Sequence, residues 1–283
     1  MELFPLTLAH EVERNVLAAL AEDIGGGDLT ALLTPAGRPA IGIVSSREDA
    51  VLCGTAWFDA CFRRLDPGAG IRWHAKDGAA IHAGQLLCEI AADTRALLSA
   101  ERCALNFLQL LSGTATQTRR YVEAVTGTRA KIVDTRKTLP GLRLAQKYAV
   151  RCGGGTNHRL GLYDGILIKE NHIIAAGSIT AALAHARALA NGNIFIQVEV
   201  ESLEELAEAL DAGATMILLD NMDLDEMRQA VGLTSSRAEL EASGGVRLET
   251  VRAIAETGVD RISIGSLTKD LRAIDLSLRH SEG

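Results

Sequence analysis

The chain of 283 residues is 47% hydrophobic and 23% charged, which is typical of globular proteins and excludes disordered, collagen-like and coiled-coil classes. Its net charge of −7 argues against bulk attraction to nucleic acid or to an anionic membrane, so neither is expected as a partner. The five cysteines lack CxxC spacing, which argues against a disulfide framework and against a structural zinc site.

The chain begins without the basic and apolar regions of a secretory signal. Its apolar runs are far shorter than the ~20 residues that span a bilayer. Together with the cysteine usage, these features predict a cytoplasmic protein.

The first part of the chain mixes helical and strand periodicity. An amphipathic helix is predicted near His10–Ala21, and a second helix over Thr94–Leu111. Short strands with glycine-bearing turns are predicted between them, at Ile41–Ser45, Ile71–His74 and Leu86–Ile90. We expect residues 1–113 to form an N-terminal domain.

From Gly113 onward, short apolar strands alternate regularly with amphipathic helices. The predicted strands are Lys131–Asp134, Gly165–Lys169, Ile194–Val200, Thr215–Leu219, Glu239–Ala242 and Arg261–Ile264. The predicted helices are Ile179–Ala190, Leu203–Ala212 and Leu248–Thr257. This alternation indicates parallel strands with right-handed crossovers. We expect residues 114–283 to form a second domain, whose C-terminal helix packs back on the first.

Each of these six strands is followed by polar residues at its carboxyl end, beginning with Asp134 and ending with Ser266. In a β/α barrel all strand ends converge on one mouth, whereas an open doubly wound sheet places its ligand at a single switch point. The pattern therefore favours a barrel. Six strands do not close an eight-stranded barrel, so either strands are missed here or the barrel is incomplete.

The segment from Arg129 to His172 holds nine lysines and arginines against three acidic residues. Those on the predicted helix from Arg143 to Arg151 are equally well explained as a solvated surface. Arg136 and Lys137 at a strand end, and His158 and Arg159 in a glycine-rich loop, instead indicate a pocket for a small ligand with several carboxylates or phosphates.

Glu199 and Asp220 end two neighbouring strands inside this basic region. Their carboxylates suit Mg²⁺ binding or stabilisation of a developing positive charge. Ion pairing with Lys137 or Lys169 is the alternative, and both roles fit within one turnover.

Two short segments after the last strands are typical of phosphate sites in barrels, where backbone N–H groups face the ligand. They are SGG (Ser243, Gly244, Gly245) and IGS (Ile264, Gly265, Ser266). His172 is expected to be a structural, hydrogen-bonding histidine. Cys152 is expected to be a small apolar residue, because the sequence places no base beside it.

Several longer motifs resemble the quinolinate phosphoribosyltransferase family. They are DTRKTLPGLR (134–143), KYAVRCGGGTNHRLGLYDGILIKENHI (147–173), QVEVES (197–202), ILLDNM (217–222) and EASGGV (241–246). The first half adds AEDIGGGDLT (21–30), REDAVLCG (47–54) and ERCALNFLQLLSG (101–113). The resemblance therefore extends over nearly the whole chain.

The resemblance implies an α/β fold with an N-terminal open-faced α/β sandwich domain and an incomplete β/α barrel. It implies transfer of phosphoribosyl from 5-phosphoribosyl 1-diphosphate to quinolinate with Mg²⁺ and loss of CO₂, giving nicotinate mononucleotide for NAD synthesis. It also implies a homodimer with shared sites, and leaves a higher oligomer open.

The family's site residues carry over position by position. Arg136, His158, Arg159 and Lys169 would hold the quinolinate carboxylates beside Thr135, and Arg102 would enter the neighbouring subunit's site. Lys137, Glu199 and Asp220 would be catalytic and would handle the diphosphate substrate and its metal. The 5-phosphate would bind at Ser243, Gly244, Gly245, Ile264, Gly265 and Ser266.

One position departs from the family. The chain has GSLTKD (265–270) where members commonly have GALTHS, so Lys269 replaces a histidine and the role of that histidine is in doubt.

Three other functions were weighed. The ModD paralogues linked to molybdenum transport differ around the loop that here has Asn157, His158 and Arg159. A transferase for nicotinate needs to bind one carboxylate fewer, so it needs fewer cationic residues than this site has. A non-catalytic binder of phosphorylated metabolites gains nothing from Glu199 and Asp220 beside a basic pocket.

Overall fold

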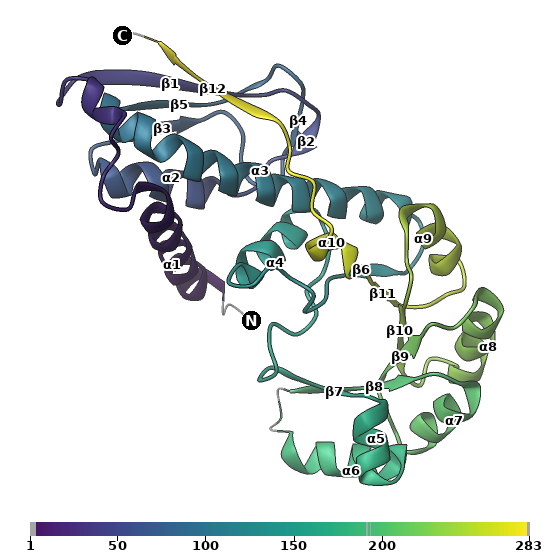
Figure 1. Ribbon diagram of the computed structural model, residues 1–283. Helices are drawn as coiled ribbons and strands as arrows, with labels where there is room; N and C mark the ends of the chain where they lie inside the picture. Colours follow the sequence, from purple (N-terminus) through teal and green to yellow (C-terminus); the bar gives the residue numbers. More distant parts are fainter. Residues whose placement is uncertain (1–3, 191, 193, 282–283) are drawn as a thin grey trace. The chain divides into compact units, whose positions relative to one another are not determined.

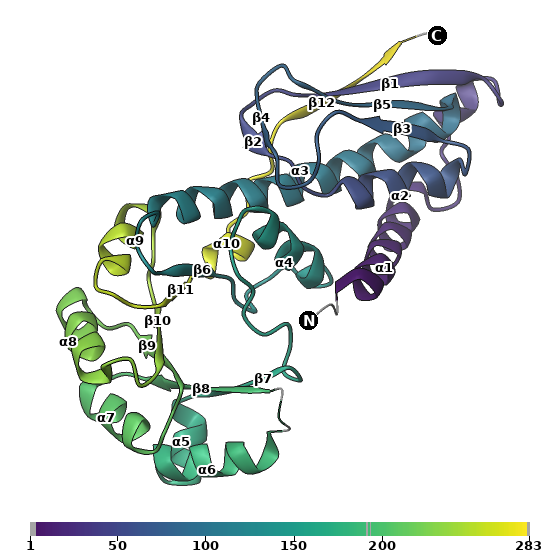
Figure 2. The same cartoon turned by 180° about the vertical axis from the view of Figure 1, so that it is seen from behind.

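The computed structural model describes residues 4–190, 192 and 194–281. It divides into two compact units (Figures 1 and 2). Unit 1 comprises residues 1–119, 138–154 and 268–283, and unit 2 comprises residues 120–137 and 155–267. The expected domain boundary at residue 113 stays a prediction. No helix in the described ranges is long and apolar enough to cross a membrane.

A four-stranded antiparallel sheet forms the base of unit 1, in the order β12-β1-β5-β3. Its strands are β1 (Pro39–Ser46), β3 (Gly70–Trp73), β5 (Leu86–Asp93) and β12 (Leu276–Ser281). A separate two-stranded ladder joins β2 (Ala50–Val51) to β4 (Ala80–Ile81). Buried Val44 and exposed Ile41 alternate along β1, so one face is packed and the other is open.

Helices cover the packed face of this sheet. Figures 1 and 2 show α2 and α3 running along it. The helices of unit 1 are α1 (Phe4–Ile24), α2 (Thr55–Leu65), α3 (Thr94–Ala124, which continues past residue 119) and α4 (Arg143–Cys152), with a 3-10 turn at Ala31–Leu33. Trp57, Phe58 and Phe62 of α2 and Leu97 of α3 are fully buried members of one hydrophobic core.

Two parts of unit 1 differ from the sequence-based expectation. Helix α3 continues through Gly113, where the missing side chain lets the backbone of Arg272 approach: an added Cβ would lie 2.2 Å from the carbonyl oxygen of Arg272. The expected C-terminal helix is wrong. That segment is strand β12, because Leu276 and Leu278 alternate with polar residues and pair with β1.

Six parallel strands form the sheet of unit 2, in the order β6-β11-β10-β9-β8-β7. They are β6 (Lys131–Val133), β7 (Gly165–Ile168), β8 (Phe195–Val200), β9 (Met216–Asp220), β10 (Glu239–Ser243) and β11 (Arg261–Ser263). All six predicted strands are confirmed. Within the described residues β6 and β7 are the two edges of the sheet, so the incomplete barrel is confirmed as well.

Helices lie along the convex face of this sheet (Figure 1). They are α5 (Glu170–Ala176), α6 (Ile179–Leu189), α7 (Leu203–Asp211), α8 (Leu224–Thr234) and α9 (Leu248–Ala255), and a short α10 (Ser266–Lys269) follows β11. Val198, Ile217 and Ile262 are fully buried in the second hydrophobic core. Near-continuous apolar strands form because both faces of each strand are covered.

Candidate active site

The carboxyl ends of the six parallel strands bring most of the predicted site residues to one edge of unit 2. Thr135, Arg136 and Lys137 follow β6, Lys169 follows β7, Glu199 is the penultimate residue of β8, and Asp220, Ser243 and Ile264–Ser266 end or follow β9 to β11. His158 and Arg159 lie in the segment between α4 and β7. Arg102 belongs to unit 1, where its side chain is exposed on α3.

Asp134 organises the segment that carries His158. It is fully buried directly after β6 and accepts hydrogen bonds from Nδ2 of Asn157 at 2.6 Å and from the backbone N–H of His158 at 2.9 Å. The N–H of Asp134 donates in turn to the carbonyl of Thr156. From the sequence, Asp134 was predicted only as a polar residue at a strand end, with no role of its own, and that position was the available signal.

The imidazole of His158 is directed toward protein groups. The N–H of Arg159 donates to Nδ1 at 2.8 Å, so the proton of the neutral ring is on Nε2, which lies 2.8 Å from Oε1 of Gln197. The same Nε2 is 3.8 Å from Oε1 of buried Glu241. Direct contact between His158 and a substrate carboxylate therefore stays a prediction.

Buried polar side chains that were not predicted from the sequence continue from that ring. Oε2 of Glu241 accepts a hydrogen bond from Nε of Arg261 at 2.9 Å, while its Oε1 has no hydrogen-bond partner among the described residues. Gln197 is equally buried. Gln197 lies in β8 and Glu241 lies in β10. A single polar residue within an apolar stretch was the only sequence signal for either of them.

The positive charges of two guanidinium groups act on each other at this edge. The pKa of Arg159 is lowered, first by burial and then by the positive charge of Arg136, while Asp164 acts in the opposite direction. Nη1 of Arg159 donates to the carbonyl of Gly165 at 3.0 Å. Like charges held this close are stabilised when an anion binds between them, so the pair is suited to a ligand with more than one carboxylate.

The second charged group of the site joins Lys169 to the two acidic residues. Nζ of Lys169 donates to Oε2 of Glu199 at 2.7 Å, which is the ion pair that the sequence analysis left open. Asp220 lies near them, and its pKa is raised first by burial and then by the charge of Glu199. Because Asp220 is partly buried beside the second negative charge of Glu199, binding of a cation here would be favourable.

His172 has the structural role that was expected. Its Nδ1 accepts a hydrogen bond from the N–H of Lys169 at 3.0 Å, which closes a capping box at the start of α5. The bond fixes the backbone of Lys169 where β7 ends.

The two glycine segments fit closely against neighbouring residues. Gly244 has φ +104°, and an added Cβ would lie 2.1 Å from Oδ1 of Asn221. At Gly265 an added Cβ would lie 2.9 Å from Cδ of Lys137, so glycine lets the lysine side chain cross the end of β11. Oγ of Ser266 is buried and has no hydrogen-bond partner in the described part of the chain. These features suit a bound phosphate.

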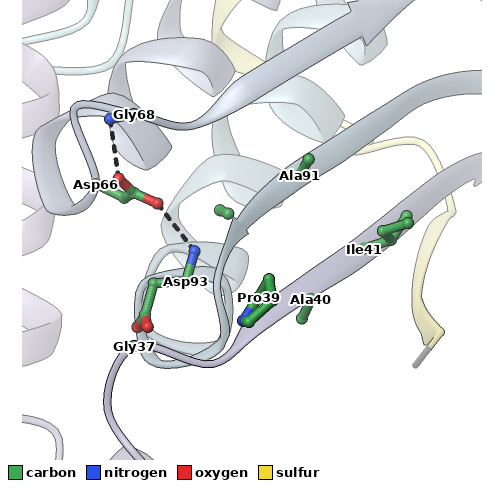
Figure 3. Close-up of a pocket in the computed structure, with 9 residues that line it drawn as sticks. Gly37, Pro39, Ala40, Ile41, Asp66, Gly68, Ala91 and Asp93 are labelled. Atoms are coloured by element: carbon green, nitrogen blue, oxygen red, sulfur yellow. Dashed lines mark hydrogen bonds between the residues drawn. The ribbon is translucent and has the colours of Figure 1, made fainter. Parts of the chain in front are cut away.

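A pocket of about 580 Å³ lies elsewhere, beside β1 and β5 in unit 1 (Figure 3). Its lining is mainly apolar, and the two oxygens of Asp66 accept backbone N–H groups of Gly68 and Asp93. It offers no cationic side chain, so we do not assign the anionic substrates to it.

Comparison with protein families covers both parts of the chain. The family described as "Quinolinate phosphoribosyl transferase, C-terminal domain" matches residues 114–279, and the corresponding N-terminal domain matches residues 28–112.

Curated relatives and solved structures agree. The chain is 44% identical over 257 residues to a probable nicotinate-nucleotide pyrophosphorylase [carboxylating] of Bacillus subtilis, covering 91% of this chain and 89% of the relative. It is 45% identical over 274 residues to the Mycobacterium leprae nicotinate-nucleotide pyrophosphorylase [carboxylating], covering 93% and 95%. The solved Francisella tularensis nicotinate-nucleotide pyrophosphorylase superposes with a TM-score of 0.94 at 44% identity, covering 96% and 97%.

Proposed function

Because this chain belongs to the quinolinate phosphoribosyltransferase family, we propose that it transfers phosphoribosyl from 5-phosphoribosyl 1-diphosphate to the ring nitrogen of quinolinate. The products are nicotinate mononucleotide, CO₂ and diphosphate, and the reaction belongs to NAD biosynthesis. We place the enzyme in the cytoplasm.

The observation that supports this proposal most directly is the mutual repulsion of Arg136 and Arg159, whose positive charges act on each other. Two neighbouring guanidinium groups fit a dicarboxylate better than a monocarboxylate, because each can form a bidentate pair with one carboxylate. This favours quinolinate over nicotinate. Lys169 adds a third cation at the end of β7.

The acidic residues suit the second substrate. When the bond from ribose C1 to diphosphate breaks, positive charge develops on the ribose, and the carboxylates of Glu199 and Asp220 stabilise it. The ring nitrogen of quinolinate then forms the new bond to C1. Lys137 beside Gly265 neutralises negative charge on the departing diphosphate, and the segments at Ser243–Gly245 and Ile264–Ser266 hold the 5-phosphate.

Loss of CO₂ leaves negative charge on the ring of the nucleotide. If Arg136 and Arg159 bind the quinolinate carboxylates as proposed, their positive charges stabilise this charge. No covalent bond between enzyme and substrate is required.

Phosphoribosyltransferases commonly use Mg²⁺, and the donor groups here fit that ion. Glu199 and Asp220 supply the carboxylate oxygens that Mg²⁺ prefers, and the pKa of Asp220 is raised first by burial and then by the charge of Glu199, which a bound cation would offset. These two residues would hold the ion, directly or through water, and Mg²⁺ would neutralise the diphosphate.

We further propose a homodimer in which Arg102 of one subunit completes the neighbouring site. Its exposure on α3 makes it available to a partner, and the family resemblance assigns it to the quinolinate carboxylates.

The direct test supplies purified protein with quinolinate, 5-phosphoribosyl 1-diphosphate and Mg²⁺, and follows nicotinate mononucleotide and released CO₂. Nicotinate replaces quinolinate in a parallel assay. Equal amounts of nucleotide and CO₂ from quinolinate alone support the proposal. Turnover of nicotinate alone, or of neither compound by folded protein, contradicts it.

A further inference from the structure

A cluster of reactive side chains lies in unit 1, apart from the residues of the proposed reaction. The sulfur atoms of Cys53 and Cys152 and a carboxylate oxygen of Asp77 all lie within 4.8 Å of one another. From the sequence, Cys152 was predicted to be a small apolar residue with no base nearby. The structure instead places a second thiol and a carboxylate beside it.

The two cysteines differ in their surroundings. Cys53 is fully buried, whereas Cys152 is half-buried at the end of α4. Burial raises the pKa of the Cys53 thiol, and the hydrogen bond from Cys53 lowers the pKa of Cys152. Cys152 is therefore the more acidic and the less deeply buried of the two thiols.

Hydrogen bonds hold the backbone of each cysteine in place. Oγ of Ser112 accepts from the N–H of Cys53 at 2.9 Å and donates to its carbonyl at 3.1 Å. Nη2 of Arg119 donates to the carbonyls of Cys152 and Gly78, both at 3.3 Å.

Gly78 brings the two segments together. Its N–H donates to the carbonyl of Leu52, and an added Cβ would lie 3.4 Å from the carbonyl oxygen of Cys152. The sulfur atoms are therefore near each other because of fixed backbone contacts. A disulfide needs an S–S distance of about 2 Å, so its formation here requires the two side chains to rotate toward each other.

The arrangement is less suited to a metal ion. A structural zinc site uses four protein ligands, and this cluster offers three. Both oxygens of Asp77 already accept hydrogen bonds, from the N–H of Thr55 at 3.2 Å and from the hydroxyl of Tyr148 at 2.9 Å.

We propose that Cys152 and Cys53 form an intramolecular disulfide when the protein meets a hydroperoxide, with Cys152 as the attacking thiolate and Cys53 as the resolving thiol. The Cys152 sulfur attacks one peroxide oxygen, the O–O bond breaks, and the hydroxide that leaves takes up the proton released by Cys152. Cys152 is then a sulfenic acid.

The Cys53 sulfur next attacks the Cys152 sulfur, and the S–O bond breaks. Asp77 is the nearby acceptor for the proton of Cys53 and passes it to the hydroxyl group, which leaves as water. Two thiols are oxidised to one disulfide, and one hydrogen peroxide is reduced to two waters.

The test treats the full-length, EDTA-dialysed protein with graded hydrogen peroxide. Intact mass and a non-reducing tryptic map are the readouts. We expect the loss of two hydrogens, a cross-linked pair of peptides containing Cys53 and Cys152, and full reversal by dithiothreitol. This measurement needs no variant. Absence of the cross-linked pair, while Cys152 is oxidised to sulfinic acid, overturns the proposal.

Variants separate the two roles. C53S should accumulate a dimedone-reactive sulfenic acid on Cys152, and C152S should form neither product. C103S is the matched control, because burial and Asp23 raise the pKa of Cys103 to about 11 and it lies near Cys61. It should form the disulfide as the wild type does.

A titration with Zn²⁺ alone distinguishes the metal alternative. Tight binding of zinc that C152S abolishes, together with no disulfide in the metal-free protein, overturns the proposal.

Discussion

Asp220 is the last residue of β9 and Glu199 the penultimate residue of the neighbouring parallel strand β8, and burial together with the charge of Glu199 raises the pKa of Asp220 above its ordinary value of 3.8. An acid with a raised pKa in the folded state destabilises that state once it is ionised. The cost is absent below pH 3.8, where the group is protonated in both states, and it is fully present above the raised pKa.

Asp220→Asn is therefore expected to raise the melting temperature at pH 7, and the gain should shrink as the pH falls toward 3.8. Activity should fall about 10²–10³-fold, because a carboxylate that stabilises developing charge is lost. Thermal unfolding at several pH values and steady-state kinetics test both effects. Asp225→Asn on the surface of α8 is the control, and a lower melting temperature for Asp220→Asn at pH 7 contradicts this prediction.

Arg159→Met should raise the KM for quinolinate about 10–100-fold, because a hydrogen bond between charged groups contributes about 1.5–3 kcal/mol. The variant should remain folded, since it removes the repulsion with Arg136. Kinetics with each substrate varied in turn and circular dichroism test this. Arg228→Met, on the exposed face of α8, should leave KM unchanged. An unaltered KM for quinolinate would show that Arg159 does not bind it.

Gly244→Ala should destabilise the protein by about 1–2 kcal/mol, because the backbone at φ +104° disfavours a side chain and the added Cβ meets Asn221. Binding of 5-phosphoribosyl 1-diphosphate should weaken as well. Gly232→Ala in α8 has open space around it and should stabilise by about 0.5–1 kcal/mol. Denaturant unfolding measures both, and equal stabilities of the two variants would contradict the prediction.

Arg102→Ala and Lys169→Ala should each lose activity alone and recover part of it when the two chains are co-expressed. A hybrid dimer with shared sites contains one site that carries neither change, so random assembly restores up to about a quarter of wild-type activity. Glu199 and Lys169 belong to the same subunit's part of the site. Co-expression of Glu199→Ala with Lys169→Ala should therefore restore no activity. No recovery in the first pair would mean that Arg102 does not cross the interface.

The secondary structure of unit 2 was predictable for a physical reason. A parallel strand covered on both faces is an almost unbroken apolar run, so Ile217–Leu219 and its neighbours are visible in the sequence. Unit 1 was harder to predict. Helix α2 (Thr55–Leu65) was missed, and the helix predicted to end at Leu111 continues through Gly113, where close approach of another segment requires glycine.

The sequence by itself determined which charges stand at the strand ends, because parallel strands must deliver their carboxyl ends to one edge. Lys169, Glu199 and Asp220 follow from that rule. Only the tertiary structure decided how those charges pair and which groups support them. The ring of His158 contacts Gln197, Asp134 holds the segment before it, and Cys152 meets Cys53. These contacts join residues far apart in the chain, and their geometry depends on loop conformations that no local pattern of residues encodes.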